Sequence, residues 1–125
     1  MKKNVAKTDN LIKKYTGQES RLLRPPYGAT SGKVSEAIKK PQILWSIDTR
    51  DWETRSEKAT IKAVMKNVRD GDVILIHDIH KPSVAAAKKL IPKLQKKGYQ
   101  LVTVSELAKY KDKKLKKGKK YGRIH

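Results

Sequence analysis

Residues 70–80 read Asp-Gly-Asp-Val-Ile-Leu-Ile-His-Asp-Ile-His, a polar turn followed by an apolar run that ends at a histidine. The run is short, rich in β-branched residues and bounded by polar residues, which is typical of a buried strand at about residues 72–77. Three more runs of this kind occur along the chain, at residues 21–24, 42–47 and 100–104. The pattern therefore predicts four short strands.

Segments with helical spacing precede and separate these strands. They are expected near residues 5–17, 31–39, 56–71 and 83–98, and a further helix is expected from Ser105. Pro92 lies inside the fourth segment and predicts a kink or a break there. Strands that alternate with helices pair in parallel through right-handed crossovers, so the fold class is α/β. Two architectures stay open: a small doubly wound sheet, and about half of a (β/α)₈ barrel, which is complete only at ~250 residues.

The composition excludes several classes of protein. The chain has no cysteine, which rules out a disulfide scaffold, a thiolate zinc site and a cysteine nucleophile. No stretch approaches the ~20 apolar residues that span a bilayer, so no transmembrane segment is predicted. The basic start lacks the apolar segment of a signal peptide, so no export signal is expected and the location of the protein stays open.

Positive charge is unevenly distributed along the chain. The formal net charge is +19, and residues 109–125 hold nine basic residues and one acidic residue. Few apolar residues interrupt this stretch, which predicts a solvated, basic Lys-rich C-terminal tail after a body at residues 1–108. Such charge permits electrostatic binding to nucleic acid, teichoic acid or anionic lipid. No nucleic-acid-binding motif is present, so no specific nucleic-acid partner is predicted.

Polar residues gather where three of the predicted strands end. Arg24 follows the first strand, Asp48 and Asp51 follow the second, and His77 ends the third. Because the carboxyl ends of parallel strands share one edge of a sheet, these side chains are expected to converge on one ligand site. Asp48 suits a turn, whereas Asp51 can reach His77. A carboxylate beside an imidazole equips the ring for general acid catalysis.

The loop after the first strand, Arg-Pro-Pro-Tyr-Gly at residues 24–28, is stiffened by its two prolines. The loop can fix the Arg24 guanidinium so that it orients a carboxylate. It can also fix the Tyr27 backbone N–H so that it stabilises an oxyanion. Trp52 can pack in the core or form the wall of an apolar pocket. A metal site that joins these acids to His77 and His80 is not favoured, because the spacing matches no recurrent local metal motif.

Three motifs, in this order, resemble those of the polysaccharide deacetylases of the NodB-homology type, carbohydrate esterase family 4. The family's motifs are Arg-x-Pro-Tyr-Gly, Asp-x-x-Asp-Trp and Leu-x-His-Asp, and this chain has them at residues 24–28, 48–52 and 75–78. The resemblance covers about residues 5–108. It implies the C-terminal half of a distorted (β/α) barrel, with about four parallel strands that alternate with helices.

The resemblance also implies a role for each matching residue. His77 would protonate the leaving amine, Asp51 would hold His77 and set its charge, and Arg24 would orient the catalytic base. The Tyr27 backbone N–H would bind the tetrahedral oxyanion. The residues implied to line the substrate pocket are Pro26, Trp52 and Leu75. The implied reaction is hydrolysis of N-acetyl groups on a glycan such as peptidoglycan or a chitin-type polymer, with a divalent metal, usually zinc, as cofactor.

Two earlier motifs of that family are absent from this sequence. They have the forms Thr-Phe-Asp-Asp-Gly and His-Ser/Thr-x-x-His, and they carry the catalytic base and the metal ligands. The chain alone is therefore predicted to be inactive and to lack metal ligands, and the missing N-terminal half is a candidate partner. Two other interpretations stay open: a basic module that binds an anionic polymer, and a truncated gene product without a function of its own. Members of the family typically act outside the cell or at its surface.

Overall fold

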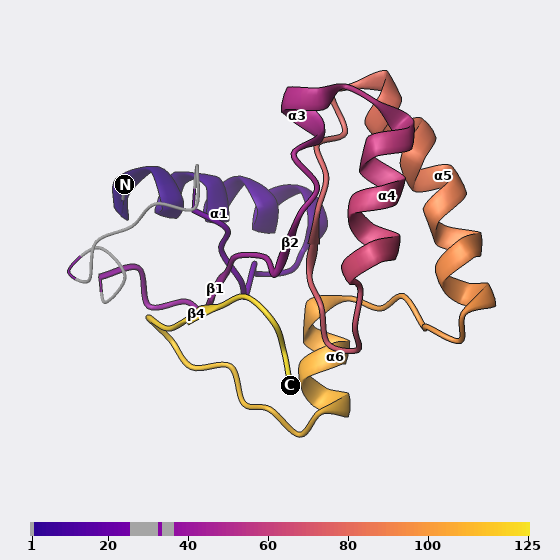
Figure 1. Cartoon of the computed structure of the whole chain (residues 1–125). Coiled ribbons are helices and arrows are strands. Elements are labelled where there is room, and N and C mark those ends of the chain that lie inside the picture. The colour runs from indigo at the N-terminus through magenta and orange to yellow at the C-terminus, as the bar shows by residue number, and fades with distance from the viewer. Residues whose placement is uncertain (1, 26–32, 34–36) are drawn as a thin grey trace. The chain divides into compact units, whose positions relative to one another are not determined.

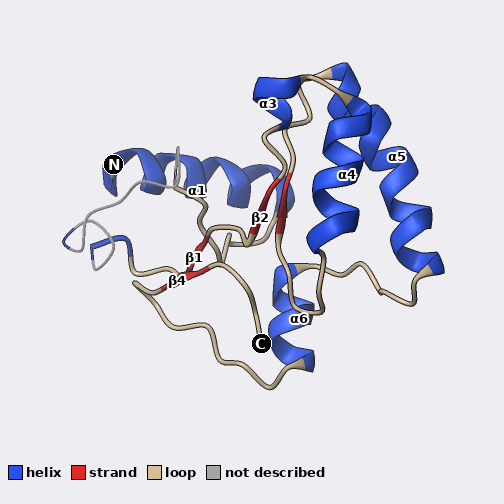
Figure 2. Cartoon of the chain, in the orientation of Figure 1, coloured by secondary structure: helices blue, strands red, loops and turns tan. Residues whose placement is uncertain are grey.

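A computed structural model describes the backbone course of residues 2–25, 33 and 37–125. The chain forms two compact units. The first comprises residues 1–44 and 114–121, and the second comprises residues 45–113 and 122–125. Figure 1 labels elements of both units, and Figure 2 colours the helices and strands by type.

The first unit contains a short parallel ladder. Strand β1 (Gln42–Ile43) pairs with strand β4 (Lys120–Tyr121), with Gln42 opposite Lys120. The strand predicted over residues 21–24 is reduced to a single parallel bridge between Leu23 and Gln42. Strand β4 was not predicted, because two residues among lysines carry no strand pattern.

One long helix also belongs to the first unit. Helix α1 (Lys2–Thr16) confirms the helix expected near residues 5–17, and it ends before Gly17, whose φ of 75° suits a residue without a side chain. The helix expected near residues 31–39 falls largely outside the described residues, although Ala37 and Ile38 are helical. Neither α1 nor any other described helix is long and apolar enough to cross a membrane.

The C-terminal residues differ from the solvated tail that the composition predicts. The Leu44 backbone N–H donates to the Tyr121 carbonyl at 2.8 Å, next to the β1–β4 pair. Ile124 is fully buried in the second unit, and its backbone N–H donates to the Gly71 carbonyl at 2.9 Å. The expectation is therefore wrong for residues 120–124, because β4 supplies backbone partners and Ile124 supplies apolar burial, whereas residues 112–114, 116, 117 and 119 are exposed as expected.

The second unit holds a second parallel strand pair and four helices. Strand β2 (Ile47–Asp48) pairs with β3 (Ile74–Leu75), with Asp48 opposite Leu75. The helices are α3 (Asp51–Thr54), α4 (Glu57–Asn67), α5 (Lys81–Lys96) and α6 (Val104–Tyr110). In Figure 1, α4 lies beside α5, and it also packs against β2. The chain is thus a mixed α/β structure with parallel strands, although the strands are shorter than predicted.

Side-chain caps decide where α4 and α6 begin. The Ser56 hydroxyl accepts a backbone N–H of the first turn at 3.1 Å, so α4 starts where the sequence predicts. Thr103 and Glu106 form a capping box, in which each side chain accepts the backbone N–H of the other residue. The strand predicted over residues 100–104 is therefore wrong, because this cap commits the backbone to a helix that begins at Val104.

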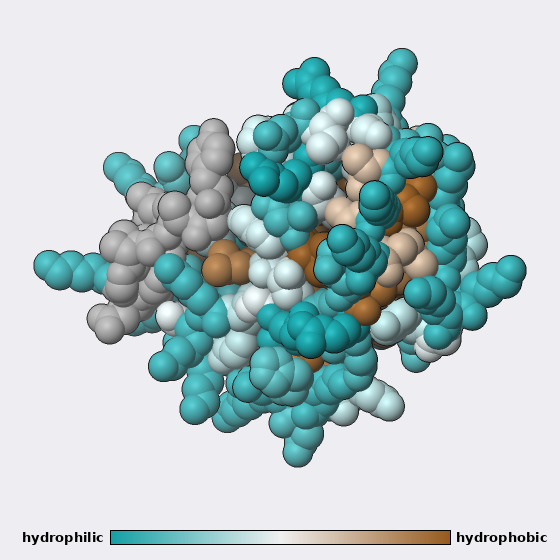
Figure 3. Space-filling model, in the orientation of Figure 1, coloured by the Kyte–Doolittle hydropathy of each residue, from teal (hydrophilic) through white to brown (hydrophobic). Residues whose placement is uncertain are grey.

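Apolar side chains from β2, α4 and α5 pack together as the core of the second unit. Its most buried members are Ile47, Val64, Leu90 and Leu94. Figure 3 shows brown, apolar surface where α4 meets α5, surrounded by teal, hydrophilic side chains. This packing fixes both helices against the strand pair, whose carboxyl ends carry the candidate site.

Helix α5 buries only part of its apolar residues against the core. Val84 and Ile91 have helical spacing with the core leucines, yet they are 40% and 45% exposed. The buried residues of α5 are instead Ser83, Ala86, Leu90 and Leu94. The helix also runs unbroken through Pro92, so the break considered there is absent. A polar residue, Ser83, therefore lies on the buried face.

Candidate functional site

The ends of β2 and β3 bring two distant parts of the chain together. Because the strands are parallel and Asp48 lies opposite Leu75, the segments that follow both strands leave the ladder at the same edge. Thr49 is buried and donates its hydroxyl to the Leu75 carbonyl at 2.8 Å, which holds the two exits together. Asp51 and His77 therefore come from neighbouring strand ends.

A tight turn after β2 directs Asp51 inward. Asp48 Oδ1 accepts the Arg50 backbone N–H at 2.9 Å, and Arg50 has a φ of 53°, in the left-handed region. This reversal makes Asp51 the first residue of α3 and buries its side chain completely. Asp48 is thus a turn residue, and Asp51 is the carboxylate that reaches the site.

The Asp51 carboxylate accepts three hydrogen bonds. Its Oδ2 accepts the His77 backbone N–H at 2.6 Å and the Ser83 hydroxyl at 2.7 Å. Its Oδ1 lies 2.8 Å from Nδ1 of the His77 ring. Both carboxylate oxygens are occupied, and the three residues Asp51, His77 and Ser83 form what we call the Asp51 cluster.

Asp51 is charged at neutral pH although it is buried. Burial raises the pKa of its carboxyl, but hydrogen bonds from the His77 backbone, the Ser83 hydroxyl and the His77 ring outweigh burial and lower that pKa to about 2. An ionised carboxylate can only accept hydrogen bonds, so Nδ1 of His77 carries a proton. Nε2 is then the nitrogen left for proton exchange. The His77 side chain is 39% exposed, so a ligand can reach the ring.

Ser83 is the member of the Asp51 cluster that the motifs do not reveal. A serine near the start of a helix suggests a cap, but His80 occupies the N-cap position of α5. Counting back from Leu94 and Leu90 by helical spacing leads to Ala86 and Ser83. Ser83 could therefore have been found in the sequence as a hydroxyl residue on the apolar face of a helix that begins just after a strand.

Two predicted pocket residues lie in the second unit with the Asp51 cluster. Trp52 follows Asp51 in α3, and half of its surface is exposed. Leu75 lies in β3, two residues before His77, and it is 9% exposed. Trp52 therefore has the accessibility that a pocket wall needs, and Leu75 packs as part of the strand pair.

The predicted residues of the loop after Leu23 belong to the first unit or lie outside the described residues. Arg24 donates from Nε to the Ile43 carbonyl at 3.2 Å and from Nη2 to the Leu44 carbonyl at 3.3 Å. These two contacts hold its guanidinium at the end of β1. Pro26 and Tyr27 lie outside the described residues.

The Asp51 cluster does not fit a metal ion. Within residues 2–25, 33 and 37–125, no three or more His, Cys, Asp or Glu side chains gather in the manner of a metal site. Asp51 uses both of its oxygens in hydrogen bonds, and His77 Nδ1 faces that carboxylate as a donor. The cluster is therefore suited to handling a proton rather than to ligating a metal.

Individual relatives match this chain, although no family model does. The peptidoglycan-N-acetylmuramic acid deacetylase PdaC of Bacillus subtilis (strain 168) is 41% identical over 109 residues, which cover 87% of this chain and 23% of that protein. The peptidoglycan-N-acetylglucosamine deacetylase PgdA of Listeria monocytogenes serotype 1/2a (strain 10403S) is 39% identical over 117 residues, which cover 94% of this chain and 24% of that protein. The chain thus spans about a quarter of the length of these curated relatives.

Solved structures extend the similarity to the fold. The structure of PdaC from Bacillus subtilis matches with a TM-score of 0.86 at 40% identity, over 89% of this chain and 55% of that one. A family 4 acetyl xylan esterase from Clostridium thermocellum, in complex with a cobalt ion, matches with a TM-score of 0.91 at 29% identity. That match covers 98% of this chain and 62% of the esterase chain, so the short parallel strands and helices correspond to part of a larger fold.

Proposed function

We propose that this chain, which is homologous to a portion of the polysaccharide deacetylases of carbohydrate esterase family 4, supplies the general acid of a glycan deacetylase. The observation that carries the proposal is the contact between His77 Nδ1 and the ionised, buried Asp51 carboxylate. The deacetylase relatives and the three ordered motifs support the same reaction class. The deacetylase-like portion is assigned to residues 1–108, followed by the Lys-rich segment 109–125.

In the proposed reaction, an N-acetyl group on a glycan is hydrolysed to acetate and a free amine. When the tetrahedral intermediate collapses, the C–N bond breaks and the leaving nitrogen takes the proton from Nε2 of His77. The ring becomes neutral and keeps its other proton on Nδ1, which donates to Asp51. Asp51 therefore makes Nε2 the donating nitrogen and stabilises the imidazolium before the transfer.

The remaining motif residues take the roles that the family resemblance implies. Arg24 orients the catalytic base, and its two backbone contacts support that role by restricting the guanidinium. The Tyr27 backbone N–H stabilises the oxyanion of the intermediate. The residues assigned to the pocket for the acetyl group are Pro26, Trp52 and Leu75.

Residues 1–125 alone are proposed to be inactive. Neither Thr-Phe-Asp-Asp-Gly nor His-Ser/Thr-x-x-His occurs in this sequence, and the described residues gather no metal-ligand cluster. The catalytic base and the ligands of a divalent metal, expected to be zinc, must then come from residues outside these 125. Without them the acetyl carbonyl is not polarised and the attacking water is not activated, so an acid alone gives no measurable turnover.

The proposal is tested by placing residues 5–108 of this chain in the matching portion of PdaC, whose own remaining residues complete the protein. Amine release from peptidoglycan is expected from the chimera and not from residues 1–125 with added zinc. In the chimera, His77→Ala should lower kcat by about 100-fold or more, because proton transfer to the leaving amine is lost. His80→Ala is the matched control, since His80 caps α5 without a side-chain cap bond.

Two results would count against the proposal in different ways. A chimera that is fully active with alanine at position 77 would remove His77 from the reaction. Amine release by residues 1–125 alone would instead contradict the proposed inactivity and would show that a base and a metal site are present in this chain.

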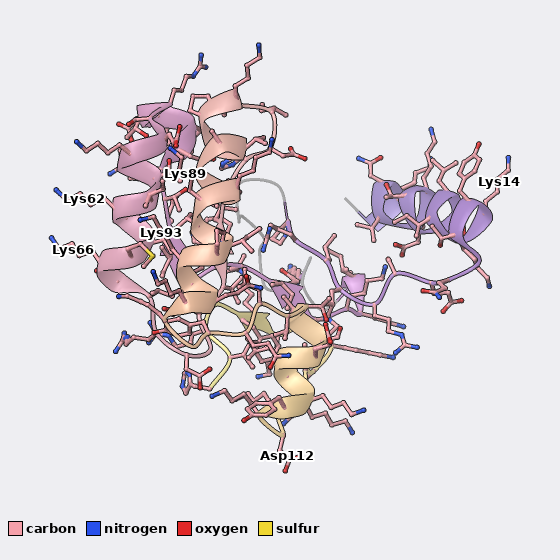
Figure 4. The ribbon with its side chains drawn as sticks, turned by 90° about the vertical axis from the view of Figure 1, so that its right-hand side faces the viewer. Lys14, Lys62, Lys66, Lys89, Lys93 and Asp112 are labelled. Carbon is pink, nitrogen blue, oxygen red and sulfur yellow. The ribbon has the colours of Figure 1, made fainter. Side chains whose placement is uncertain are left out.

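A second candidate function, attachment to an anionic polymer, is favoured by the surface of α4 and α5. These helices carry eight lysines and one acidic residue. Lys58, Lys62 and Lys66 repeat every fourth residue along α4, and like charges at that spacing destabilise a helix by ~0.2–0.5 kcal/mol per pair. Figure 4 shows Lys62 and Lys66 on α4 beside Lys89 and Lys93 of α5. An external anion would relieve this repulsion.

A groove of about 500 Å³ lies within this lysine surface. Its lining residues are Glu57, Lys58, Ile61, Lys89 and Lys93. Lys89 is paired with Glu57, which leaves the other lysines to set the positive potential. Because no aromatic side chain lines the groove to stack on a base, a phosphate polymer of the teichoic acid type suits it better than a single-stranded nucleic acid.

A charge-matched pair of variants tests this candidate. One variant replaces Lys62, Lys66 and Lys93 with glutamine, and the control replaces Lys3, Lys7 and Lys14 of α1 in the same way. Binding to purified teichoic acid at ~0.15 M salt should weaken by at least tenfold in the first variant and change little in the control. Equal weakening in both variants would show that only the net charge matters, which would contradict a site on α4 and α5. Tighter binding to duplex DNA through the same lysines would show that the partner is a nucleic acid and not a teichoic acid.

A further inference from the structure

Ser83 occupies an unusual position for a serine. It lies in the first turn of α5, its side chain is fully buried, and its hydroxyl donates to Asp51 Oδ2 at 2.7 Å. Asp51 comes from the start of α3, 32 residues earlier in the chain, so this bond is a tertiary contact and not a local cap. A hydroxyl on the core face of a helix therefore has a buried anion as its partner.

We propose that Ser83 is a positioning residue that fixes the rotation of the Asp51 carboxylate and thereby keeps the His77 ring in its Nδ1–H form. This inference rests on the proposed general-acid role of His77. It adds to that role a third group, from a third element, which touches neither substrate nor the transferred proton.

The rotation of the Asp51 carboxylate decides which of its oxygens faces the His77 ring. The last torsion of an aspartate is broad, so a carboxylate without restraints exchanges its two oxygens freely. In Asp51, Oδ2 is held by two donors, the His77 backbone N–H at 2.6 Å and the Ser83 hydroxyl at 2.7 Å. With Oδ2 fixed in this way, Oδ1 is presented to Nδ1 of the imidazole at 2.8 Å.

Ser83 is the donor that ties this arrangement to the rigid part of the unit. The other two bonds come from His77 itself, so they move with the residue that they are meant to orient. Ser83 instead shares its helix face with Ala86, Leu90 and Leu94, which are all buried. Core packing of α5 therefore determines where the hydroxyl lies and, through it, where the carboxylate points.

The hydroxyl also helps to lower the pKa of the buried Asp51 carboxyl. A buried carboxylate is stable as an anion only while hydrogen-bond donors replace its lost water. Alanine at position 83 would leave Oδ2 with one donor, whereas threonine would keep the hydroxyl. Cysteine would keep nearly the same shape with a much weaker donor, which separates loss of the bond from loss of packing.

NMR of the full chain tests the inference without any catalytic turnover. The carboxyl ¹³C signal of Asp51 reports its titration, and the ring ¹⁵N signals of His77 report which nitrogen carries the proton. In the unmodified chain and in Ser83→Thr, Asp51 should titrate near pH 2 and His77 should be the Nδ1–H form. In Ser83→Ala and Ser83→Cys, the Asp51 midpoint should rise toward the ordinary value of about 3.9, and the ring should become a mixture of tautomers. Ser105→Ala, an exposed serine of α6, is the control and should change neither signal.

The outcomes separate this inference from the proposed function. Unchanged Asp51 and His77 signals in folded Ser83→Ala, or in Ser83→Cys if the alanine variant unfolds, would overturn the role of Ser83 and leave the general acid in place. An Nε2–H tautomer in the unmodified chain would overturn the general-acid proposal itself. In the PdaC chimera, Ser83→Ala should lower kcat by about tenfold with KM unchanged, and threonine should restore it.

Discussion

Gly71 and the C-terminal segment provide a sharp test of how the second unit is held together. Gly71 has a φ of 88°, and its carbonyl accepts the Ile124 backbone N–H at 2.9 Å. A Cβ atom at position 71 would overlap the Ile124 carbonyl oxygen and would lie 3.2 Å from its carbon. Both are backbone atoms, so no side chain can move aside. The substitution Gly71→Ala should therefore displace Ile124 from its buried position.

The expected cost has three parts. The left-handed backbone strains any residue with a Cβ by about 1–2 kcal/mol. Loss of the hydrogen bond to Ile124 costs about 0.5–1.5 kcal/mol. Exposure of the Ile124 side chain, which is fully buried, costs up to about 1.5–3 kcal/mol. Together these amount to about 3–6.5 kcal/mol, a large fraction of the 5–15 kcal/mol that is typical of a folded domain.

Gly98→Ala is the matched control. Gly98 has a nearly equal φ of 93°, but a Cβ there would meet nothing within 4 Å, so only the backbone strain remains. Urea unfolding followed by circular dichroism should place the free energy of unfolding of Gly71→Ala about 2–4.5 kcal/mol below that of Gly98→Ala. Ile124→Ala should lower the free energy of unfolding by less in the Gly71→Ala chain than in the unmodified chain, because the burial of the Ile124 side chain is already lost there. Equal free energies of unfolding for the two glycine variants would refute the reasoning.

Three further substitutions test the core, a cap and the charge of Asp51. Leu90→Ala should lower the free energy of unfolding by about 2–5 kcal/mol, whereas Val84→Ala, on the exposed face of the same helix, should cost less than about 1 kcal/mol. Ser56→Ala should cost about 1 kcal/mol in a urea titration, because α4 loses its cap bond. Asp51 has a pKa of about 2 in the folded chain against about 3.9 unfolded, so it stabilises the fold above about pH 4 and this stability is lost as the pH falls toward 2. That loss, about 2–3 kcal/mol by linkage, should be absent from the pH dependence of Asp51→Asn.

Local features of the sequence predicted several elements correctly because their causes are local. Ser56 caps α4 through its own first turn, and Gly98, with its positive φ, follows the end of α5 where the pattern places it. The helix after Thr103 likewise depends on a capping box within four residues. The mixed α/β class with short parallel strands also follows from the alternation of apolar and helical segments, although no helix separates β1 from β2.

Strand pairing could not be predicted in the same way, because a strand is defined by partners far along the chain. The apolar run at residues 42–47 divides into β1 and β2, which pair with β4 and β3 respectively. The run at residues 100–104 is apolar enough for a strand but finds no partner. Conversely, Lys120–Tyr121 has no strand pattern and pairs because the chain returns to β1. Propensity is a weak guide where long-range pairing decides.

In the candidate site, too, some features follow from the sequence and others depend on contacts between distant parts of the chain. Sequence alone assigned Asp51 and His77 to neighbouring strand ends and identified the motifs that contain them. It also favoured Asp51 over Asp48 as the carboxylate that reaches His77, but it did not include Ser83. The left-handed turn at Arg50 turns one aspartate outward and the next inward, and the core face of α5 carries Ser83 to it. These outcomes depend on tertiary structure, because a buried charge is stable only where donors from separate elements meet around it.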